Sequence, residues 1–159
     1  MKRALYAVPI FMAILPLAAQ APAVGNVWKA DDLKAKGAAL TAKLDAHKLA
    51  TQTLGSLGPG YTTLVAHREG SGEAEWHDNA ADLTVIEDGE CTLIMGGAIK
   101  DGHSTGAGET RGTSIEGGTE YRLGPGDVIY VPPKTPHQMV IAPGGKLTYW
   151  LVKIPAPKP

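Results

Sequence analysis

The sequence predicts a mainly β fold, an antiparallel jelly-roll barrel of about eight strands with one N-terminal α-helix. Three observations support this prediction. The 20 glycines and 12 prolines among 159 residues punctuate many short strands and disfavour a bundle of long helices. From Tyr61 onward, short runs rich in β-branched and aromatic residues alternate with turn residues. The length suits one domain, and a hydrophobic content of 43% is enough to form a core.

The beginning of the chain predicts a secretory leader. Two basic residues, Lys2 and Arg3, precede an apolar stretch over 4–19, and small residues follow. An uncleaved membrane anchor is the alternative, but the stretch is short for a membrane span and contains two prolines. We therefore expect an exported protein, periplasmic or extracellular, with no stable membrane insertion after the leader is removed. The expected divisions are a signal peptide over 1–21, a helix and linker over 22–60, and a barrel domain over 61–159.

One helical segment is expected, from Trp28 to about Leu54. Asp31 and Asp32 fall in its first turn, where carboxylates interact favourably with the positive end of the helix dipole. Residues that keep to one face follow at Leu33, Leu40, Leu44 and His47. We expect this stripe to pack on the outside of the barrel, with binding to a partner as the alternative.

The strands are expected after residue 60. They are predicted at 61–67, 73–77, 83–87, 91–99, 119–123, 128–131, 137–141 and 147–154. The glycine-rich segment between Lys100 and Gly118 shows no apolar rhythm, and we expect it to form a long loop.

Charge and motifs exclude several classes of function. The 15 basic and 16 acidic residues leave a formal charge of -1, so nucleic acid is not an expected partner. The single cysteine, Cys91, cannot form a disulfide within the chain or a multi-cysteine zinc site. The sequence contains neither the Gly-x-Ser-x-Gly motif of serine hydrolases nor a phosphate-binding loop ending in Gly-Lys-Ser or Gly-Lys-Thr.

Two segments carry the residues of chemical interest. In the first, over 75–89, Glu75 and His77 are two apart on a predicted strand and therefore share a face, and Asp82 can approach them across the next turn. The second, over 126–137, reads GDVIYVPPKTPH and ends at His137. If the strands lie side by side, the four side chains converge. Two histidines with carboxylates suit divalent iron, manganese, zinc, nickel or copper.

In order and in internal spacing, the two segments resemble the two motifs of the cupin family, and the resemblance extends over roughly 61–154. In the second motif, Gly126, Pro132 and His137 match, while Lys134 stands where the family has glycine. Cupins typically hold a metal with three histidines and one glutamate. The positions that correspond to these ligands are occupied here by Glu75, His77, Asp82 and His137.

Each of these residues also has a structural interpretation. Asp82 is equally compatible with an Asx-type turn, and Glu75 with a solvent-facing carboxylate on an edge strand. Gln138, Tyr130 and Arg111 are weaker candidates for substrate contacts and are otherwise surface or core residues. The three remaining histidines, His47, His67 and His103, are expected at the surface.

The resemblance implies a small metal-dependent protein that acts on an oxygen-bearing small molecule, by oxygenase-type or by isomerase- or lyase-type chemistry. It also implies a homodimer. The alternative is a cupin that binds a sugar-like small molecule without catalysis, because the fold alone does not choose between these functions. A structural oligomer is a third and weaker hypothesis.

Overall fold

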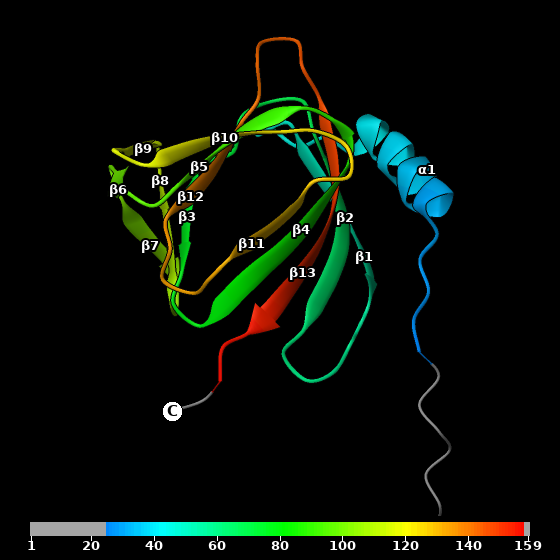
Figure 1. Ribbon diagram of the computed structural model, residues 1–159, viewed down its shortest axis with the longest axis horizontal. Helices are drawn as coiled ribbons and strands as arrows, with labels where there is room; N and C mark the ends of the chain where they lie inside the picture. Colours follow the sequence, from blue (N-terminus) through cyan, green and yellow to red (C-terminus); the bar gives the residue numbers. More distant parts are fainter. Residues whose placement is uncertain (1–24, 158–159) are drawn as a thin grey trace, which may run out of the picture.

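Two antiparallel β-sheets face each other in the computed structural model of the chain, which describes residues 25–157 (Figure 1). The first sheet has the strand order β1 (Leu49–Gly55), β2 (Thr62–Arg68), β13 (Leu147–Pro155), β4 (Ala80–Gly89) and β11 (Val128–Val131). The second has the order β10 (Thr119–Leu123), β5 (Cys91–Met95), β12 (His137–Val140), β3 (Ala74–His77), β8 (Glu109–Gly112) and β7 (His103–Gly106). A two-stranded sheet pairs β6 (Ala98–Lys100) with β9 (Ser114–Glu116). The predicted mainly β fold with one N-terminal helix is confirmed.

The space between the two large sheets is filled by side chains from alternate strand positions. The buried core includes Ala66, Ile86, Leu93, Leu147 and Tyr149. On β2 and β13 the neighbouring residues, Val65 and Trp150, face the opposite way and pack under the helix. This two-residue alternation places one side-chain set of each strand inside the barrel and leaves the other outside.

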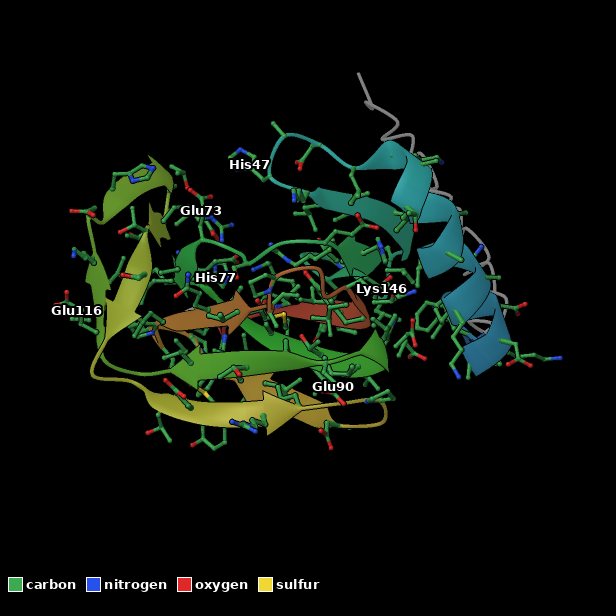
Figure 2. The ribbon with its side chains drawn as sticks, turned by 90° about the horizontal axis from the view of Figure 1, so that it is seen from above. His47, Glu73, His77, Glu90, Glu116 and Lys146 are labelled. Carbon is green, nitrogen blue, oxygen red and sulfur yellow. The ribbon has the colours of Figure 1, made fainter. Side chains whose placement is uncertain are left out.

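Helix α1 (Ala30–Leu40) lies against the outer face of the first sheet (Figure 2). It buries Leu33 and Leu40 against this sheet, and a 3₁₀ turn, Thr41–Lys43, follows. The prediction that the helix packs on the outside of the barrel is confirmed.

The prediction that the helix continues to about Leu54 is wrong. The Asp45 side chain accepts hydrogen bonds from the backbone N–H groups of His47 and Leu49, which turns the chain, and Lys48 adopts a left-handed φ of 55°. The chain then forms strand β1, which pairs with β2. The alternation of threonines in LATQTLG is typical of a strand, and tertiary pairing decides the conformation here.

The prediction of a long loop over 100–118 is also wrong, because this segment contains the strands β7, β8 and β9. All four residues of β7 are exposed, so this strand buries no apolar side chain and gives no periodic hydrophobic signal. Backbone pairing of β8 with both β3 and β7 defines these strands instead. The described residues contain thirteen strands in all, more than the eight expected.

The predicted signal peptide, residues 1–21, lies outside the described residues. Within 25–157, no helix combines the length and the apolar character needed to cross a membrane.

Candidate metal centre

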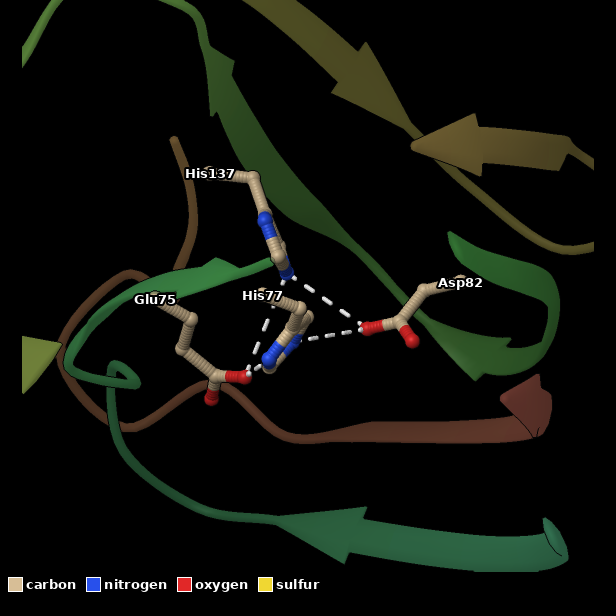
Figure 3. Close-up of side chains that lie close together, drawn as sticks. All are labelled: Glu75, His77, Asp82 and His137. Carbon is tan, nitrogen blue, oxygen red and sulfur yellow. Dashed lines mark ion pairs between the residues drawn. The ribbon is translucent and has the colours of Figure 1, made fainter. Parts of the chain in front are cut away.

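Three strands bring Glu75, His77, Asp82 and His137 together between the sheets (Figure 3). Glu75 and His77 share one face of β3, as their spacing predicts. His137 lies on the neighbouring strand β12, directly opposite Glu75. Asp82 lies on β4 in the facing sheet. Two neighbouring strands of one sheet and one strand of the other therefore supply the cluster.

The four side chains are close enough to share one ion. Nε2 of His77 lies 3.4 Å from Oε2 of Glu75 and 3.3 Å from Oδ2 of Asp82. Nε2 of His137 lies 3.9 Å and 3.5 Å from the same two oxygens. Ligands about 2.1 Å from a common ion are about 3.4 Å apart in a tetrahedron, and about 3.0 or 4.2 Å apart in an octahedron. The four distances between histidine nitrogens and carboxylate oxygens, 3.3 to 3.9 Å, lie within this range, and no two of the four donor atoms are more than 4.8 Å apart.

Both imidazoles turn the same nitrogen toward the cluster. Nδ1 of His77 donates to Oε2 of Glu109 over 2.6 Å, and Nδ1 of His137 donates to the carbonyl oxygen of Thr135 over 3.1 Å. A carbonyl and a carboxylate can only accept, so each Nδ1 carries a proton and each Nε2 is the nitrogen that faces the cluster. Histidines that bind metals are usually oriented in this way by a hydrogen bond to the other nitrogen.

Nε2 of His77 is buried and has no hydrogen-bond partner among the described residues. Buried polar atoms without partners are rare, because losing water without replacing its hydrogen bond is costly. A cation at the centre of the cluster would satisfy this atom.

The electrostatics of the cluster favour a bound cation. Burial raises the pKa of Glu75, but the adjacent His77 and the Arg111 guanidinium lower it by more. The pKa of Glu75 is therefore about 2, below its ordinary value of 4.5. Burial likewise raises the pKa of Asp82, but the two histidines and Lys153 hold it well below its ordinary value. Both carboxylates are therefore ionised at neutral pH.

The same carboxylates act on His77 in the opposite sense. Burial lowers the pKa of His77, whereas the adjacent carboxylates of Asp82 and Glu75 raise it, to about 9. In the metal-free protein a proton thus occupies the position that faces the two carboxylates. A metal ion binding there must displace it.

Basic side chains also contact both carboxylates. Nζ of Lys153 lies 3.0 Å from Oδ1 of Asp82. Glu75 forms an ion pair with Arg111, and its Oε1 lies 3.7 Å from Nη2 of Arg68. Each acidic side chain therefore has one oxygen directed at the histidines and at least one contact with a cationic side chain.

A cavity of about 40 Å³ adjoins the cluster inside the barrel. Its lining combines Glu75, Asp82 and His137 with apolar side chains that include Leu93, Ile129 and Val131. This volume holds one or two water molecules and not a whole organic substrate. A substrate would have to reach the cluster from the barrel mouth.

The three candidate substrate contacts lie in different surroundings. Gln138 lines the cavity, but its amide donates to the carbonyl oxygens of Gly72 and Thr113 and so braces two loops. Tyr130 is 55% exposed, and its neighbours on β11, Ile129 and Val131, face the cavity instead. The structure therefore places Tyr130 on the outer face of the barrel, and we leave it out of the proposed site.

Arg111, the third candidate, lies beside the cluster as the partner of Glu75, with Glu109 3.7 Å away. Sequence reasoning missed Glu109, Lys153 and Arg68. Glu109 and Arg111 are two apart, a spacing that indicates a shared strand face, but the segment was expected to be a loop. No local pattern marks Lys153 or Arg68.

One of the three remaining histidines is not at the surface. His67 is 3% exposed, and its Nδ1 lies 2.9 Å from the Thr148 hydroxyl, because α1 covers this part of the sheet. His47 and His103 are exposed, as expected.

Comparison with known proteins gives a family match and several structural matches. Residues 107–152 match the family described as cupin domain, a range that includes His137 but not the other three cluster residues. No curated protein sequence matches the chain. A Streptomyces PAC13 variant with uridine is similar in structure, with a TM-score of 0.50 and 15% identity over 72% of this chain and 75% of that chain.

Two other solved structures are similar at slightly lower scores. A cupin 2 conserved barrel domain protein from Rhodopseudomonas palustris has a TM-score of 0.48 and 19% identity over 70% of this chain and 63% of its own. The polyketide cyclase RemF from Streptomyces resistomycificus has a TM-score of 0.47 and 18% identity, over 70% and 68%. At such identities the similarity concerns the fold.

Proposed function

We propose that the chain is a metal-dependent cupin enzyme acting on an oxygen-bearing small molecule, with one divalent transition metal held by Glu75, His77, Asp82 and His137. The match of residues 107–152 to the cupin domain family supports this proposal. The observation that carries this proposal is the convergence of two histidine Nε2 atoms and two ionised carboxylates within 4.8 Å. A mixed nitrogen and oxygen set of this kind suits iron, manganese, zinc, nickel or copper better than calcium or magnesium.

When bound, a divalent metal supplies Lewis acidity toward a carbonyl or enol oxygen, and a redox-active metal also supplies dioxygen chemistry. The protein's own contribution is to orient and to shield. Glu109 and the Thr135 carbonyl fix the orientation of the two imidazoles. Leu93, Ile129 and Val131 keep one side of the cluster apolar, which strengthens the electrostatic interactions within it.

The substrate would approach from a second hollow. A groove of about 220 Å³ shares Arg68, Gly72, Glu73 and Glu75 with the interior cavity, so the two spaces meet at Glu75. The groove is smaller than the roughly 300 to 1,000 Å³ of pockets for drug-sized ligands. This favours a small substrate, with its reacting oxygen at the cluster and the rest of the molecule in the groove.

The same groove supports the second candidate function, the capture of a sugar-like molecule without turnover. Its lining is polar and includes Asp45, His47 and Arg111, which can donate to and accept from hydroxyl groups. We also propose that the protein is exported to the periplasm or beyond, from its predicted leader. The proposal that it forms a homodimer comes from its resemblance to cupins.

A turnover screen tests the proposed function. The metal-free protein is reloaded separately with Mn(II), Fe(II), Zn(II), Ni(II) or Cu(II) and incubated with small 1,3-dicarbonyl compounds, hydroxy acids and sugars, and the products are followed by NMR. We expect turnover with at least one metal, its loss in His137→Ala, and its retention in His103→Ala, which alters an exposed histidine. Binding of a sugar without turnover under any metal would favour the second candidate instead.

A further inference from the structure

Two arginines converge on Glu75 where the interior cavity meets the outer groove. Arg111 on β8 reaches Oε2 of Glu75, and Arg68 on β2 lies 3.7 Å from Oε1 of the same carboxylate. Arg111 lines the groove, and Arg68 lines both the groove and the cavity. Two other residues that line this groove, His47 and Glu73, are labelled in Figure 2. A ligand in the groove would meet both guanidinium groups beside the metal cluster.

Arg68 has more hydrogen-bonding capacity than its surroundings use. It is 7% exposed, and within residues 25–157 its hydrogen bond runs from Nε to the Tyr149 hydroxyl, over 3.1 Å. The 3.7 Å contact with Glu75 is longer than a hydrogen bond. A guanidinium has five N–H donors, and a buried charge is costly unless it is paired and hydrogen-bonded. The terminal nitrogens of Arg68 are therefore suited to an additional anionic partner.

The Arg68 guanidinium packs directly against the backbone at Gly72. A Cβ atom at residue 72 would lie 2.9 Å from Nη1 of Arg68 and 3.1 Å from its Cζ. Gly72 does not have a positive φ, so its backbone conformation does not require glycine. The absence of a side chain at residue 72 instead lets the Arg68 guanidinium occupy this position, at the wall that the cavity and the groove share.

We propose that Arg68 and Arg111 bind the carboxylate of a small organic acid, which places the rest of the acid against the metal cluster. This proposal rests on the proposed metal function. Guanidinium groups bind planar carboxylates through paired hydrogen bonds, which lysine cannot match. The groove volume of about 220 Å³ limits the acid to a small molecule.

Metal and acid should bind cooperatively. Glu75 is the carboxylate that contacts both arginines. A divalent ion that shares Oε2 of Glu75 withdraws part of this negative charge and leaves the arginines less compensated. The acid then gains affinity when the metal is present, and by linkage the metal gains the same factor when the acid is present.

Calorimetric titration with malonate tests this site, with inorganic phosphate as the competing anion. The titrations use the metal-free and Mn(II)-loaded forms of the wild type, Arg111→Gln, Arg68→Gln and the control Arg122→Gln, which alters an exposed arginine on β10. We expect malonate affinity to fall at least about tenfold in the two groove variants and to be unchanged in the control. We also expect malonate to bind more tightly than phosphate, and more tightly with Mn(II) than without.

Malonate affinity that is equal in all four proteins, or no malonate binding by the wild type, would overturn the proposal. Phosphate binding as tight as malonate binding would overturn the assignment to carboxylates. If Arg68→Gln does not fold, as thermal unfolding would reveal, the less buried Arg111→Gln still decides the result. Failure of Mn(II) to bind would count against the metal function alone, because arginine-dependent malonate binding by the metal-free protein would still support the acid site.

Discussion

Glu109 holds His77 in place for metal binding: Nδ1 of His77 lies 2.6 Å from Oε2 of Glu109, so the opposite nitrogen, Nε2, faces the cluster. Glu109 lies on β8, which pairs with β3 through His77 itself. The exposed side of the barrel thus contributes to the buried site through one hydrogen bond.

Removing this hydrogen bond should weaken metal binding without abolishing it. We expect Glu109→Ala to lower Zn(II) affinity about 10- to 100-fold, because the imidazole loses both its orientation and part of its basicity. Competition with a chromogenic chelator measures the affinity. Glu116→Ala, which alters an exposed carboxylate on β9, is the matched control. Equal affinities in the two variants would show that Glu109 does not position His77.

The pH dependence of stability should distinguish the metal-free from the metal-bound protein. The pKa of His77 is raised from an ordinary 6.5 to about 9 in the metal-free fold, against the effect of burial, by Asp82 and Glu75. A raised folded-state pKa stabilises the protein fully below pH 6.5, and this stabilisation is lost as the pH rises through about 9. We therefore expect the Tm of the metal-free protein to fall between pH 6 and pH 9, and to fall less in His77→Gln.

Over the same pH range, metal affinity should change in the opposite direction. The ion displaces the His77 proton, so affinity should rise with pH by up to about tenfold per unit until His77 is deprotonated. Chelator competition at several pH values measures the slope. A flat profile between pH 6.5 and 9 would mean that His77 does not exchange a proton for the ion.

The packing of α1 on the barrel depends on Gly37. A Cβ atom at residue 37 would lie 2.2 Å from Cγ2 of Thr148, whose hydroxyl bonds His67. Alanine favours helices by about 1 kcal/mol over glycine, but this overlap forces the helix away from the sheet. We expect Gly37→Ala to destabilise the fold by about 1 to 3 kcal/mol in urea unfolding. Ala38→Gly, on the exposed side, should cost only about 1 kcal/mol, and a gain in stability from Gly37→Ala would disprove this packing.

Lys134 occupies a backbone conformation that favours glycine. Its φ is 63°, and its N–H donates to the carbonyl oxygen of His77, which ties the turn to the end of β3. We expect Lys134→Gly to stabilise the protein by about 0.5 to 1 kcal/mol through relief of this strain. The ion pair with Asp78 that is lost is exposed and contributes little. Lys146→Gly, an exposed position without a positive φ, should give no gain, and equal effects of the two changes would argue against strain at 134.

The sequence was informative where short-range rules operate. The two-residue spacing of Glu75 and His77 predicted their shared face, and turn residues located the strand that carries His137. The strand predicted over 83–87 begins earlier, at Ala80, and therefore includes Asp82. The strand β1 was predicted as helix because alanines and leucines before it continue a helical pattern. The turn at Asp45 depends on side-chain hydrogen bonds that propensity does not include.

The surroundings of the site could not be predicted, because they depend on contacts between distant residues. Arg68 and Glu75 lie on different sheets, and Lys153 meets Asp82 only through the pairing of β13 with β4. Tyr130 was a weak candidate on the strand predicted over 128–131. The register of β11 against β4 nevertheless turns it outward and turns Ile129 and Val131 toward the cavity.

The most direct test of this account is the metal content of the purified protein after incubation with excess Zn(II) or Mn(II) and removal of free ion, measured by mass spectrometry. The account predicts about one ion per chain for the wild type and for the exposed-histidine control His103→Ala, and less than about a tenth of that for His77→Ala and His137→Ala. Equal metal content in all four proteins would contradict a site formed by these two imidazoles.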